Sequence, residues 1–264
     1  MTNESKTLFI PLYGKAMMSK KGFFTDKTAE RIADSCEYDF ADVDKSEKLA
    51  IYMAMRAMQY DELAEQFIQK YPDSIIIHLG CGLDSRCVRL SHTPKMWYDL
   101  DFPDVIELRK KYYTENVHYG MIESSVTDLQ WLDSIDHKGE QVLVIAEGLS
   151  MYLTEDEVAA LMDALGTKFG KVTLLMDAYS KAAAKLSKIK NPINAVDAQI
   201  SFAMSDPTLL EQRCSNAKCV LNNDIILPKY IERLNGSWKT RFKFMGRFGA
   251  SFYRIYGYRI RSST

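Results

Sequence analysis

The sequence predicts an α/β fold built on a doubly wound, mostly parallel β-sheet, and two observations lead to this prediction. Short apolar runs such as Ile75–Ile77 and Val142–Ala146 are too short for helices and have the composition of strands buried on both faces. Segments with helical spacing of apolar residues alternate with these runs and are joined to them by short links. Strands and helices that alternate in this way form a parallel sheet with helices on both faces.

The composition excludes several classes of protein. The 264 residues suit one large α/β domain, and the net charge of -1 lacks the basic excess of nucleic-acid-binding proteins. No apolar run approaches the roughly 20 residues of a membrane span, and residues 1–6 lack the apolar stretch of a secretory signal. The five cysteines form no Cys-x-x-Cys pair and the four histidines are scattered. We therefore expect a cytoplasmic protein with no metal site and no membrane or nucleic-acid partner.

We expect residues 1–72 to form an N-terminal arm and helices, and residues 73–264 to form a Rossmann-like domain. Leu8–Tyr13 is apolar and is followed by several lysines. This arm either packs on the core or closes as a flap over a bound cofactor, with lysines near the carboxylate of that cofactor. Thr25 or Asp26 is placed to cap a short helix.

A long helix is predicted from Ser46 to Tyr71, because apolar residues recur at helical spacing and Pro72 follows. Arg56 lies among apolar residues of this helix. An arginine in such a setting favours bidentate pairing with an anion. An ordinary salt bridge is the alternative, and the pattern alone favours the salt bridge.

The segment Ile75–Ile77 is followed by Gly80 and Gly82, a Gly-x-Gly turn of the kind that lets a backbone approach a ligand closely. A helix that begins near Asp84 would direct its first amides into the same crevice. The third glycine of the dinucleotide fingerprint is replaced by Ser85. The turn thus indicates an adenosyl cofactor without a pyrophosphate, although plain strand-to-helix turns also contain Gly-x-Gly.

The second predicted strand, residues 95–101, ends in Asp99 and Asp101, and Pro103 opens the next helix. Acidic side chains at the tip of this strand, about twenty residues after the glycines, accept hydrogen bonds from ribose hydroxyls. A third strand over Val117–Ile122 leads into a polar loop that would meet an adenine edge or would simply be a loop.

The fourth predicted strand, Val142–Ala146, ends on Glu147, which places a carboxylate at the crevice where ligands of such sheets bind. Thr154–Glu157 has the sequence of a capping box and starts a helix. Val172–Met176 is the fifth predicted strand.

Residues 179–228 interrupt the alternation, and we interpret them as an insertion that covers the crevice as a lid and shapes the substrate pocket. Structural padding is the alternative. Thr208–Arg213 is expected to be a helix within the insertion. Phe242–Phe244 and Ser251–Ile260 are predicted as late strands that form an antiparallel hairpin at the sheet edge.

Five stretches carry motifs that are specific when they occur together. They are Pro11–Ala16, Met55–Ala57 with Tyr60–Asp61, His78–Arg86 with Arg89–Leu90, Trp97–Pro103 and Ala146–Leu153. In these motifs the chain resembles the leucine carboxyl methyltransferase family of S-adenosylmethionine-dependent enzymes, and within it the short bacterial members of the tetracenomycin polyketide O-methyltransferase type. The resemblance covers about residues 8–178.

The resemblance implies the seven-stranded sheet of class I methyltransferases and S-adenosylmethionine as cofactor, with S-adenosylhomocysteine (SAH) as product. Arg56 would pair with the methionine carboxylate, Asp101 helped by Asp99 would bind the ribose, and Glu147 would contact the methionine end. Ser125 and Val126 would flank the adenine. The full set of cofactor-binding residues that it implies is Lys21, Arg56, Gly80, Cys81, Gly82, Asp84, Asp99, Asp101, Ser125, Val126 and Glu147.

The expected activity is O-methylation of a small-molecule acid, polyketide-like or otherwise, at its carboxylate. A carboxylate is ionised at neutral pH and needs no general base, whereas a phenol with a pKa near 10 needs one. No histidine, His78 included, is expected at the crevice, and Tyr13 and Tyr152 are the candidates for a catalytic role. Lys15, Lys20 and Arg109 are the candidates for orienting the acceptor; the oligomeric state is not predicted.

Three alternatives stay open at this point. The first is a phenol or hydroxyl O-methyltransferase on the same fold, and the second is a non-catalytic module that binds the cofactor. The third is an NAD-dependent oxidoreductase, which the missing third glycine disfavours.

Overall fold

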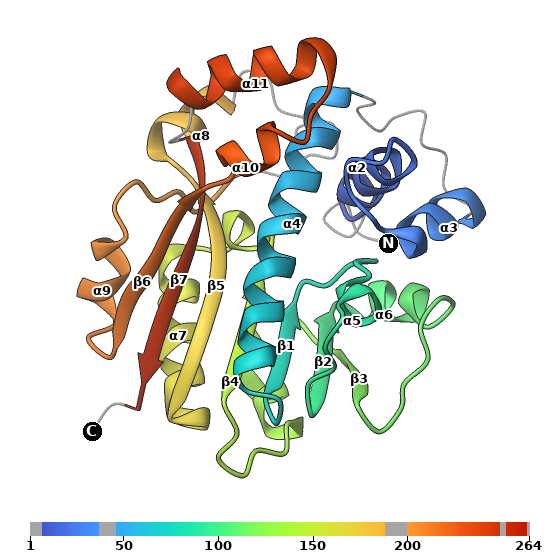
Figure 1. Cartoon of the computed structure of the whole chain (residues 1–264). Helices are drawn as coiled ribbons and strands as arrows, with labels where there is room; N and C mark the ends of the chain where they lie inside the picture. The colour runs from blue at the N-terminus through green and yellow to red at the C-terminus, as the bar shows by residue number, and fades with distance from the viewer. Residues whose placement is uncertain (1–6, 37–45, 188–199, 249–251, 263–264) are drawn as a thin grey trace.

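The computed structural model describes residues 7–36, 46–187, 200–248 and 252–262 and contains a seven-stranded sheet (Figure 1). The strands lie in the order β3-β2-β1-β4-β5-β7-β6, and β7 runs antiparallel to both of its neighbours. They are β1 (Ile75–Leu79), β2 (Met96–Asp101), β3 (Tyr119–Glu123), β4 (Val142–Ala146), β5 (Lys171–Tyr179), β6 (Ala217–Asp224) and β7 (Tyr253–Arg261). The prediction of a doubly wound, mostly parallel, seven-stranded sheet is confirmed.

The helices cover both faces of this sheet. They are α2 (Phe9–Lys20), α3 (Lys27–Ser35), α4 (Glu47–Lys70), α5 (Arg86–Arg89), α6 (Pro103–Arg109), α7 (Glu155–Phe169), α8 (Lys181–Ser187), α9 (Thr208–Arg213), α10 (Pro228–Ile231) and α11 (Gly236–Phe248), with 3-10 turns η2 (Leu129–Ser134) and η3 (Ser150–Tyr152). Figure 1 shows α4 along one face and α7 along the other. The predicted capping box at Thr154 starts α7, and α9 has the predicted bounds.

Side-chain alternation along the strands divides the core into two clusters. Ile76 and Leu143 pack toward Met55 of α4, whereas Ile77 and Val144 belong to the cluster on the α7 side. Burying an aliphatic side chain of this size stabilises the fold by roughly 1.5–3 kcal/mol. The same alternation points every second residue of β2 and β5 toward α4. The polar residues among them help to form the site described below.

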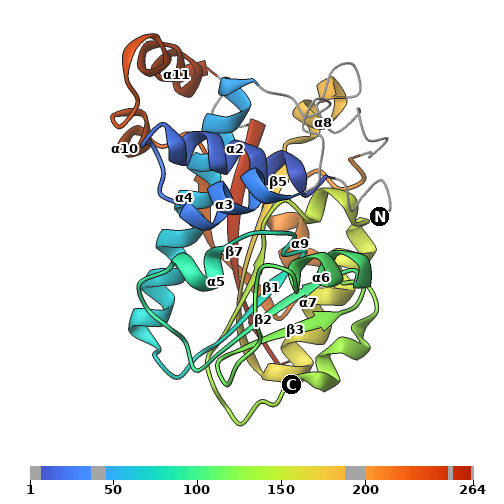
Figure 2. The same cartoon turned by 90° about the vertical axis from the view of Figure 1, so that its right-hand side faces the viewer.

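The N-terminal arm packs on the rest of the molecule. Helices α2 and α3 lie above the loop that follows β1 (Figure 2), and α2 packs against α4. Asp26 caps α3 by accepting a hydrogen bond from the backbone of Ala29 at 2.8 Å, so the predicted cap is present. Because α2 reaches the carboxyl ends of the strands, the arm forms part of the cavity wall.

Two sequence predictions at the C-terminal end are wrong. Phe242–Phe244 lies in α11 and forms no strand: Phe242 is buried and Phe244 is 67% exposed, so the pattern has helical periodicity. The partner of β7 at the sheet edge is β6, whose residues fall inside the segment 179–228 that we expected to be a lid. Residues 188–199 of that segment lie outside the described residues.

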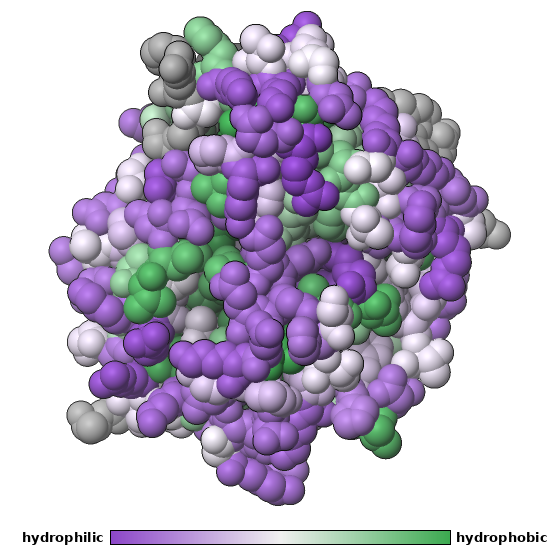
Figure 3. All heavy atoms as spheres, in the orientation of Figure 1, coloured by the Kyte–Doolittle hydropathy of each residue, from purple (hydrophilic) through white to green (hydrophobic). Residues whose placement is uncertain are grey.

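Among the described residues, no helix is long and apolar enough to cross a membrane. The face seen in Figure 3 is mostly hydrophilic, and its apolar side chains are exposed in small separate places. The large apolar residues that are exposed, and that are spread along the chain, are Val88, Val117, Val220, Phe244 and Phe252.

Candidate functional site

The main cavity lies where the loops after β1, β2, β3 and β4 meet α2 and α4. Its wall contains many of the residues expected from the sequence, which are Arg56, Gly80, Cys81, Gly82, Asp84, Asp101, Ser125, Val126, Glu147 and Tyr152. It also contains Lys15, His78 and Tyr179, to which the sequence assigned no site or only an unranked one. The wall has two parts, which we name the glycine half and the arginine half.

The glycine half is built on the turn after β1. Gly80 and Gly82 have φ angles of 61° and 51°, a conformation that favours glycine. The backbone amide of Gly82 donates to Asp101 Oδ2 at 2.8 Å, and the amide of Phe102 donates to Asp101 Oδ1 at 2.8 Å. Burial raises the pKa of Asp101. These contacts fix the carboxylate at the cavity wall, at the tip of β2.

Asp99 is not among the residues that line the cavity, which argues against the expected contact with the ribose. It is fully buried, and its carboxylate accepts hydrogen bonds from Arg109, from Tyr119 Oη at 2.7 Å and from Trp97 Nε1 at 2.8 Å. Burial alone would raise the pKa of Asp99, but the charge of Arg109, the neighbouring His78 and the hydrogen bond from Trp97 lower it to about 2. Asp99 thus ties β2 to β3 and α6.

The loop after β3 completes the glycine half. Ser125 and Val126 line the cavity, and Ser125 Oγ lies 2.8 Å from Thr127 Oγ1. Trp131 is buried, and its Nε1 donates to the carbonyl of Val126 at 3.3 Å. The tryptophan packs beneath the loop and fixes its position.

The arginine half centres on Arg56 of α4. Its Nε donates to Glu147 Oε1 at 2.9 Å and its Nη1 donates to Tyr253 Oη at 3.0 Å. Gly148 has a φ of 69°, and a Cβ there would come within 3.1 Å of Arg56 Nη1. Among the described residues, the other terminal nitrogen, Nη2, has no hydrogen-bond partner. The guanidinium is therefore held in place with one nitrogen available to a ligand.

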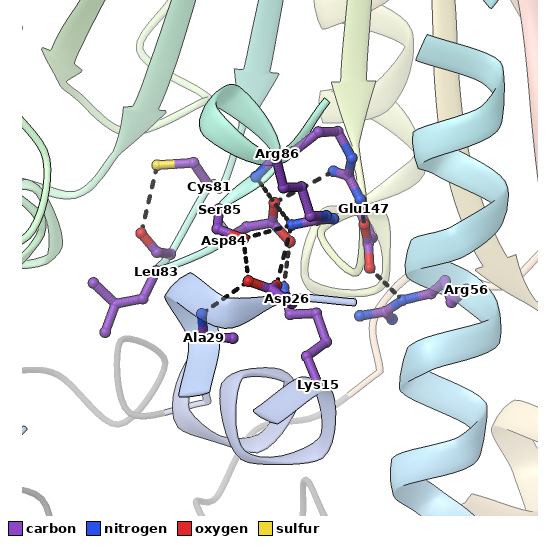
Figure 4. Close-up of polar contacts among 12 residues, drawn as sticks. Lys15, Asp26, Ala29, Arg56, Cys81, Leu83, Asp84, Ser85, Arg86 and Glu147 are labelled. Carbon is purple, nitrogen blue, oxygen red and sulfur yellow. Dashed lines mark hydrogen bonds and ion pairs between the residues drawn. The ribbon is translucent and has the colours of Figure 1, made fainter. Parts of the chain in front are cut away.

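Glu147 lies between two arginines. Its Oε2 accepts a hydrogen bond from Arg86 Nη2 at 2.6 Å, while Oε1 accepts from Arg56 (Figure 4). Burial alone would raise the pKa of Glu147, but Arg86 and Arg56 outweigh burial and lower the pKa to about 2. The carboxylate therefore stays ionised and is a weak base.

A buried ion cluster lies between the glycine half and the arginine half (Figure 4). Asp84 accepts hydrogen bonds from Lys15, from the backbone of Arg86 at 2.7 Å and from Arg89 at 2.9 Å. The expected helix near Asp84 is a single turn, α5, and its first amide binds the Asp84 carboxylate. Burial opposes ionisation of Asp84, but Arg86, Arg89 and Lys15 hold its pKa well below the usual range.

The structure places Lys21 outside the cavity wall, and its expected contact with the cofactor stays a prediction. This residue follows the last turn of α2, is half-exposed and pairs with Glu47 at 2.7 Å, away from the cavity wall. Lys15, one and a half turns earlier on α2, is the lysine of the cavity. The two other lysine and arginine candidates lie elsewhere: Lys20 pairs with Asp34 at 2.5 Å and Arg109 is buried on Asp99.

Two further expectations need correction. Tyr13 is not among the residues that line the cavity, whereas Tyr152 and Tyr179 are. His78, which we expected away from the crevice, also lines the cavity, although it is only 2% exposed. Its Nδ1 lies 3.4 Å from Asp99 Oδ1 and has no hydrogen-bond partner among the described residues.

The sequence of the chain matches a known family and known relatives. A family model described as leucine carboxyl methyltransferase matches residues 3–166. The tetracenomycin polyketide synthesis O-methyltransferase TcmP of Streptomyces glaucescens is 32% identical over 216 residues, which cover 81% of this chain and 80% of TcmP. The S-adenosyl-L-methionine-dependent methyltransferase dpfgK of Gibberella zeae is 28% identical over 266 residues, which cover 92% of this chain and 89% of dpfgK.

Solved structures show the same fold. A DUF574 family protein from Streptomyces avermitilis superposes with a TM-score of 0.58 at 9% identity, covering 89% of this chain and 90% of that protein. The magnesium protoporphyrin IX methyltransferase ChlM from Synechocystis, with bound SAH, has a TM-score of 0.50 at 10% identity and covers 94% of this chain and 98% of ChlM.

Proposed function

Because this chain belongs to the leucine carboxyl methyltransferase family, we propose that it transfers a methyl group to a carboxylate oxygen of a small organic acid. Its membership of this family shows that the chain is an S-adenosylmethionine-dependent methyltransferase. The acceptor and the role of each residue are the proposed part. The name of TcmP refers to polyketide synthesis, which motivates a polyketide-like acid as the acceptor.

The residues of the cavity fit this cofactor. In the glycine half, Asp101 is fixed by two backbone amides and offers a carboxylate to the ribose hydroxyls, and Ser125 and Val126 flank the adenine. In the arginine half, Arg56 offers Nη2 to the carboxylate of the amino-acid tail. A charge-assisted hydrogen bond of this kind contributes about 1.5–3 kcal/mol.

The choice of a carboxylate acceptor rests on Glu147 and Tyr179, the ionisable groups of the cavity wall beside Arg56. His78 also lines the cavity but is only 2% exposed, and Asp177 is not among the lining residues. Glu147 has a pKa of about 2, and burial raises the pKa of Tyr179 to about 12, so neither removes a proton from a phenol at neutral pH. A carboxylic acid arrives already ionised. The bound cofactor supplies an activated methyl group, and the chain must orient the acceptor and exclude water.

The test is a screen of organic acids and phenols with methyl-labelled S-adenosylmethionine. A methyl ester releases labelled methanol under mild alkali, and a methyl ether keeps its label. With a carboxylate acceptor, ionisation of the acceptor causes no steep rise in rate between pH 6 and 9, in contrast to a phenol. A product that keeps its label in alkali would show that the acceptor group is a hydroxyl and not a carboxylate. Binding of the cofactor without turnover of any acceptor would indicate a non-catalytic module.

We also propose that the enzyme acts in the cytoplasm. All five cysteines are free thiols. Free thiols suit the reducing conditions of this compartment. Fractionation of cells that produce the protein tests this location, and recovery outside the cytoplasmic fraction would contradict it.

A further inference from the structure

Strand β7, the last strand along the chain, places Tyr253 next to Tyr179, a residue of the cavity wall. In the antiparallel pairing of β5 with β7, Tyr179 lies directly opposite Tyr253. Their rings stack with centroids 4.2 Å apart and an interplanar angle of 18°. Cross-strand aromatic pairs of this kind stabilise a sheet and restrict each other's orientation. The ring of Tyr253 is therefore fixed by its position in the sheet.

The hydroxyl of Tyr253 meets Arg56. Arg56 Nη1 donates to Tyr253 Oη at 3.0 Å. Burial and the negative charge of Asp177 raise the pKa of Tyr253 well above its ordinary value, so the hydroxyl keeps its proton. Asp177 also accepts the backbone amide of Gly148 at 2.9 Å. Asp177 also lies 3.7 Å from Arg56 Nε, so Asp177 links the backbone of Gly148 to the guanidinium that Tyr253 contacts.

These contacts complement those of Glu147. Glu147 binds Nε, and Tyr253 binds Nη1, on different nitrogens of the guanidinium. With both in place, rotation about the end of the side chain is restricted and Nη2 keeps one direction. The contacts of Nε, with Glu147 at 2.9 Å and with Asp177 at 3.7 Å, give the terminal nitrogens no partner of their own.

We propose that Tyr253 is a positioning residue for the cofactor: it fixes Arg56 so that Nη2 receives the carboxylate of the amino-acid tail. This inference rests on the proposed function of Arg56. Tyr253 lies outside residues 3–166, which the family model matches. In this role, strand β7 contributes to the cofactor site in addition to pairing with β5 and β6. Tyr253 touches neither cofactor nor acceptor in this role and acts through Arg56.

The test compares two ligands and three proteins by calorimetry. SAH carries the amino-acid carboxylate, whereas 5′-methylthioadenosine has the adenosyl and sulfur parts of the cofactor without it. The proteins are the wild type, Tyr253→Phe, which keeps the ring but loses the hydroxyl, and Tyr258→Phe. Tyr258 is a matched control: it is buried on the other face of the same strand and donates to the carbonyl of Pro207 at 3.0 Å.

We expect Tyr253→Phe to weaken SAH binding about fivefold, the value of one hydrogen bond, and to leave methylthioadenosine binding within about twofold of the wild type. Tyr258→Phe should change neither affinity. Unchanged SAH affinity in Tyr253→Phe would return this tyrosine to a purely structural role. An equal loss for both ligands would show that the hydroxyl acts on the fold and would also overturn the inference.

Two outcomes separate this inference from the proposed function. If the wild-type protein binds neither ligand, the cofactor site itself is wrong and the inference fails with it. If the wild type binds both ligands and Tyr253→Phe behaves as expected, while no acid is methylated, only the acceptor is wrong. Thermal unfolding of each variant, measured alongside, confirms that the proteins compared are folded.

Discussion

The two halves of the cavity differ in how far apart along the chain their partners lie. In the glycine half, Gly82 and Asp101 bind each other across 19 residues of sequence. In the arginine half, Arg56 binds Glu147 across 91 residues and Tyr253 across 197. The glycine half is thus built from consecutive elements, β1, α5 and β2 with the loop after β3, while the arginine half exists only after α4, β4, β5 and β7 have come together.

The halves also differ in the groups that bind. Backbone amides and the half-buried carboxylate of Asp101 dominate the glycine half, whereas buried arginines and carboxylates dominate the arginine half. Removing one member of a buried ion pair leaves an uncompensated charge and costs about 3–5 kcal/mol. Substitutions should therefore affect stability where charges are buried and ligand affinity where groups face the cavity.

The largest effect is expected at Asp99, the acid next to the cavity that does not face it. Asp99→Asn leaves Arg109 without its ionised partner, so the free energy of unfolding should fall by about 3–5 kcal/mol. The matched variant Asp101→Asn, two residues away, should cost less, about 1–3 kcal/mol, because its one acceptor oxygen can bind only one of the two backbone amides that Asp101 binds. Urea unfolding measures both. Wild-type stability together with weak SAH binding in Asp99→Asn would place Asp99 in the glycine half after all.

The next effect concerns Asp177 and pH. Burial raises the pKa of Asp177 to about 6, above the usual 3.8. A raised pKa of an acid means that stability is present below about pH 4 and is lost as the pH rises through 6. Glu147 has the opposite sign: its pKa is lowered to about 2, so its contribution is present above about pH 4.5 and is lost toward pH 2.

The variant Asp177→Asn removes the first of these contributions. Relative to the wild type, its free energy of unfolding should rise between pH 4 and pH 7 by up to roughly 3 kcal/mol, since each pKa unit is worth about 1.36 kcal/mol. Thermal or urea unfolding across this range measures the difference, from which the shared contribution of Glu147 cancels. A difference that does not change with pH would mean that Asp177 titrates normally.

Substitution of Arg56 should distinguish the arginine half from the glycine half most directly. Arg56→Lys keeps the charge but loses the planar fork, so SAH binding should weaken about tenfold or more while methylthioadenosine binding stays unchanged. Asp101→Asn is the counterpart: because the ribose is present in both ligands, both affinities should fall by a similar factor. Calorimetry with the two ligands measures these ratios. Equal losses of both ligands in Arg56→Lys would remove the distinction between the halves.

The contrast explains how much of the molecule was predictable. The strand composition of Val142–Ala146, the capping box at Thr154 and the Gly80–Gly82 turn are local signals, and the fold and most of the glycine half follow from them. Asp99 was misassigned because alternation puts it on the same face as Asp101. Only the packing of Arg109 of α6 over β2 shows which of the two is covered.

The residues of the arginine half were predicted only where the sequence had a local signal or a family motif. Glu147 was expected at the crevice from its place at the end of the predicted strand Val142–Ala146, and the cofactor role of Arg56 came from the family resemblance. Tyr253 gave no signal, because one tyrosine in an alternating strand resembles the others. The same holds for Phe242, where aromatic residues at positions 242 and 244 suggested a strand although the segment is helical. Contacts between distant elements have no local pattern that would reveal them.

The smallest effect is expected at Lys21, which the resemblance placed at the cofactor. Lys21→Ala removes a half-exposed ion pair with Glu47, and such surface pairs contribute about 0–1 kcal/mol. Stability should therefore change by less than about 0.5 kcal/mol, and the affinities for SAH and methylthioadenosine should be unchanged. The contrast is with Lys15 of the same helix, whose ammonium is buried on Asp84 beside the cavity. Calorimetry on Lys21→Ala decides: a several-fold loss of SAH affinity would mean that α2 moves when the cofactor binds and brings Lys21 to the arginine half, which would make that half larger than the structure shows.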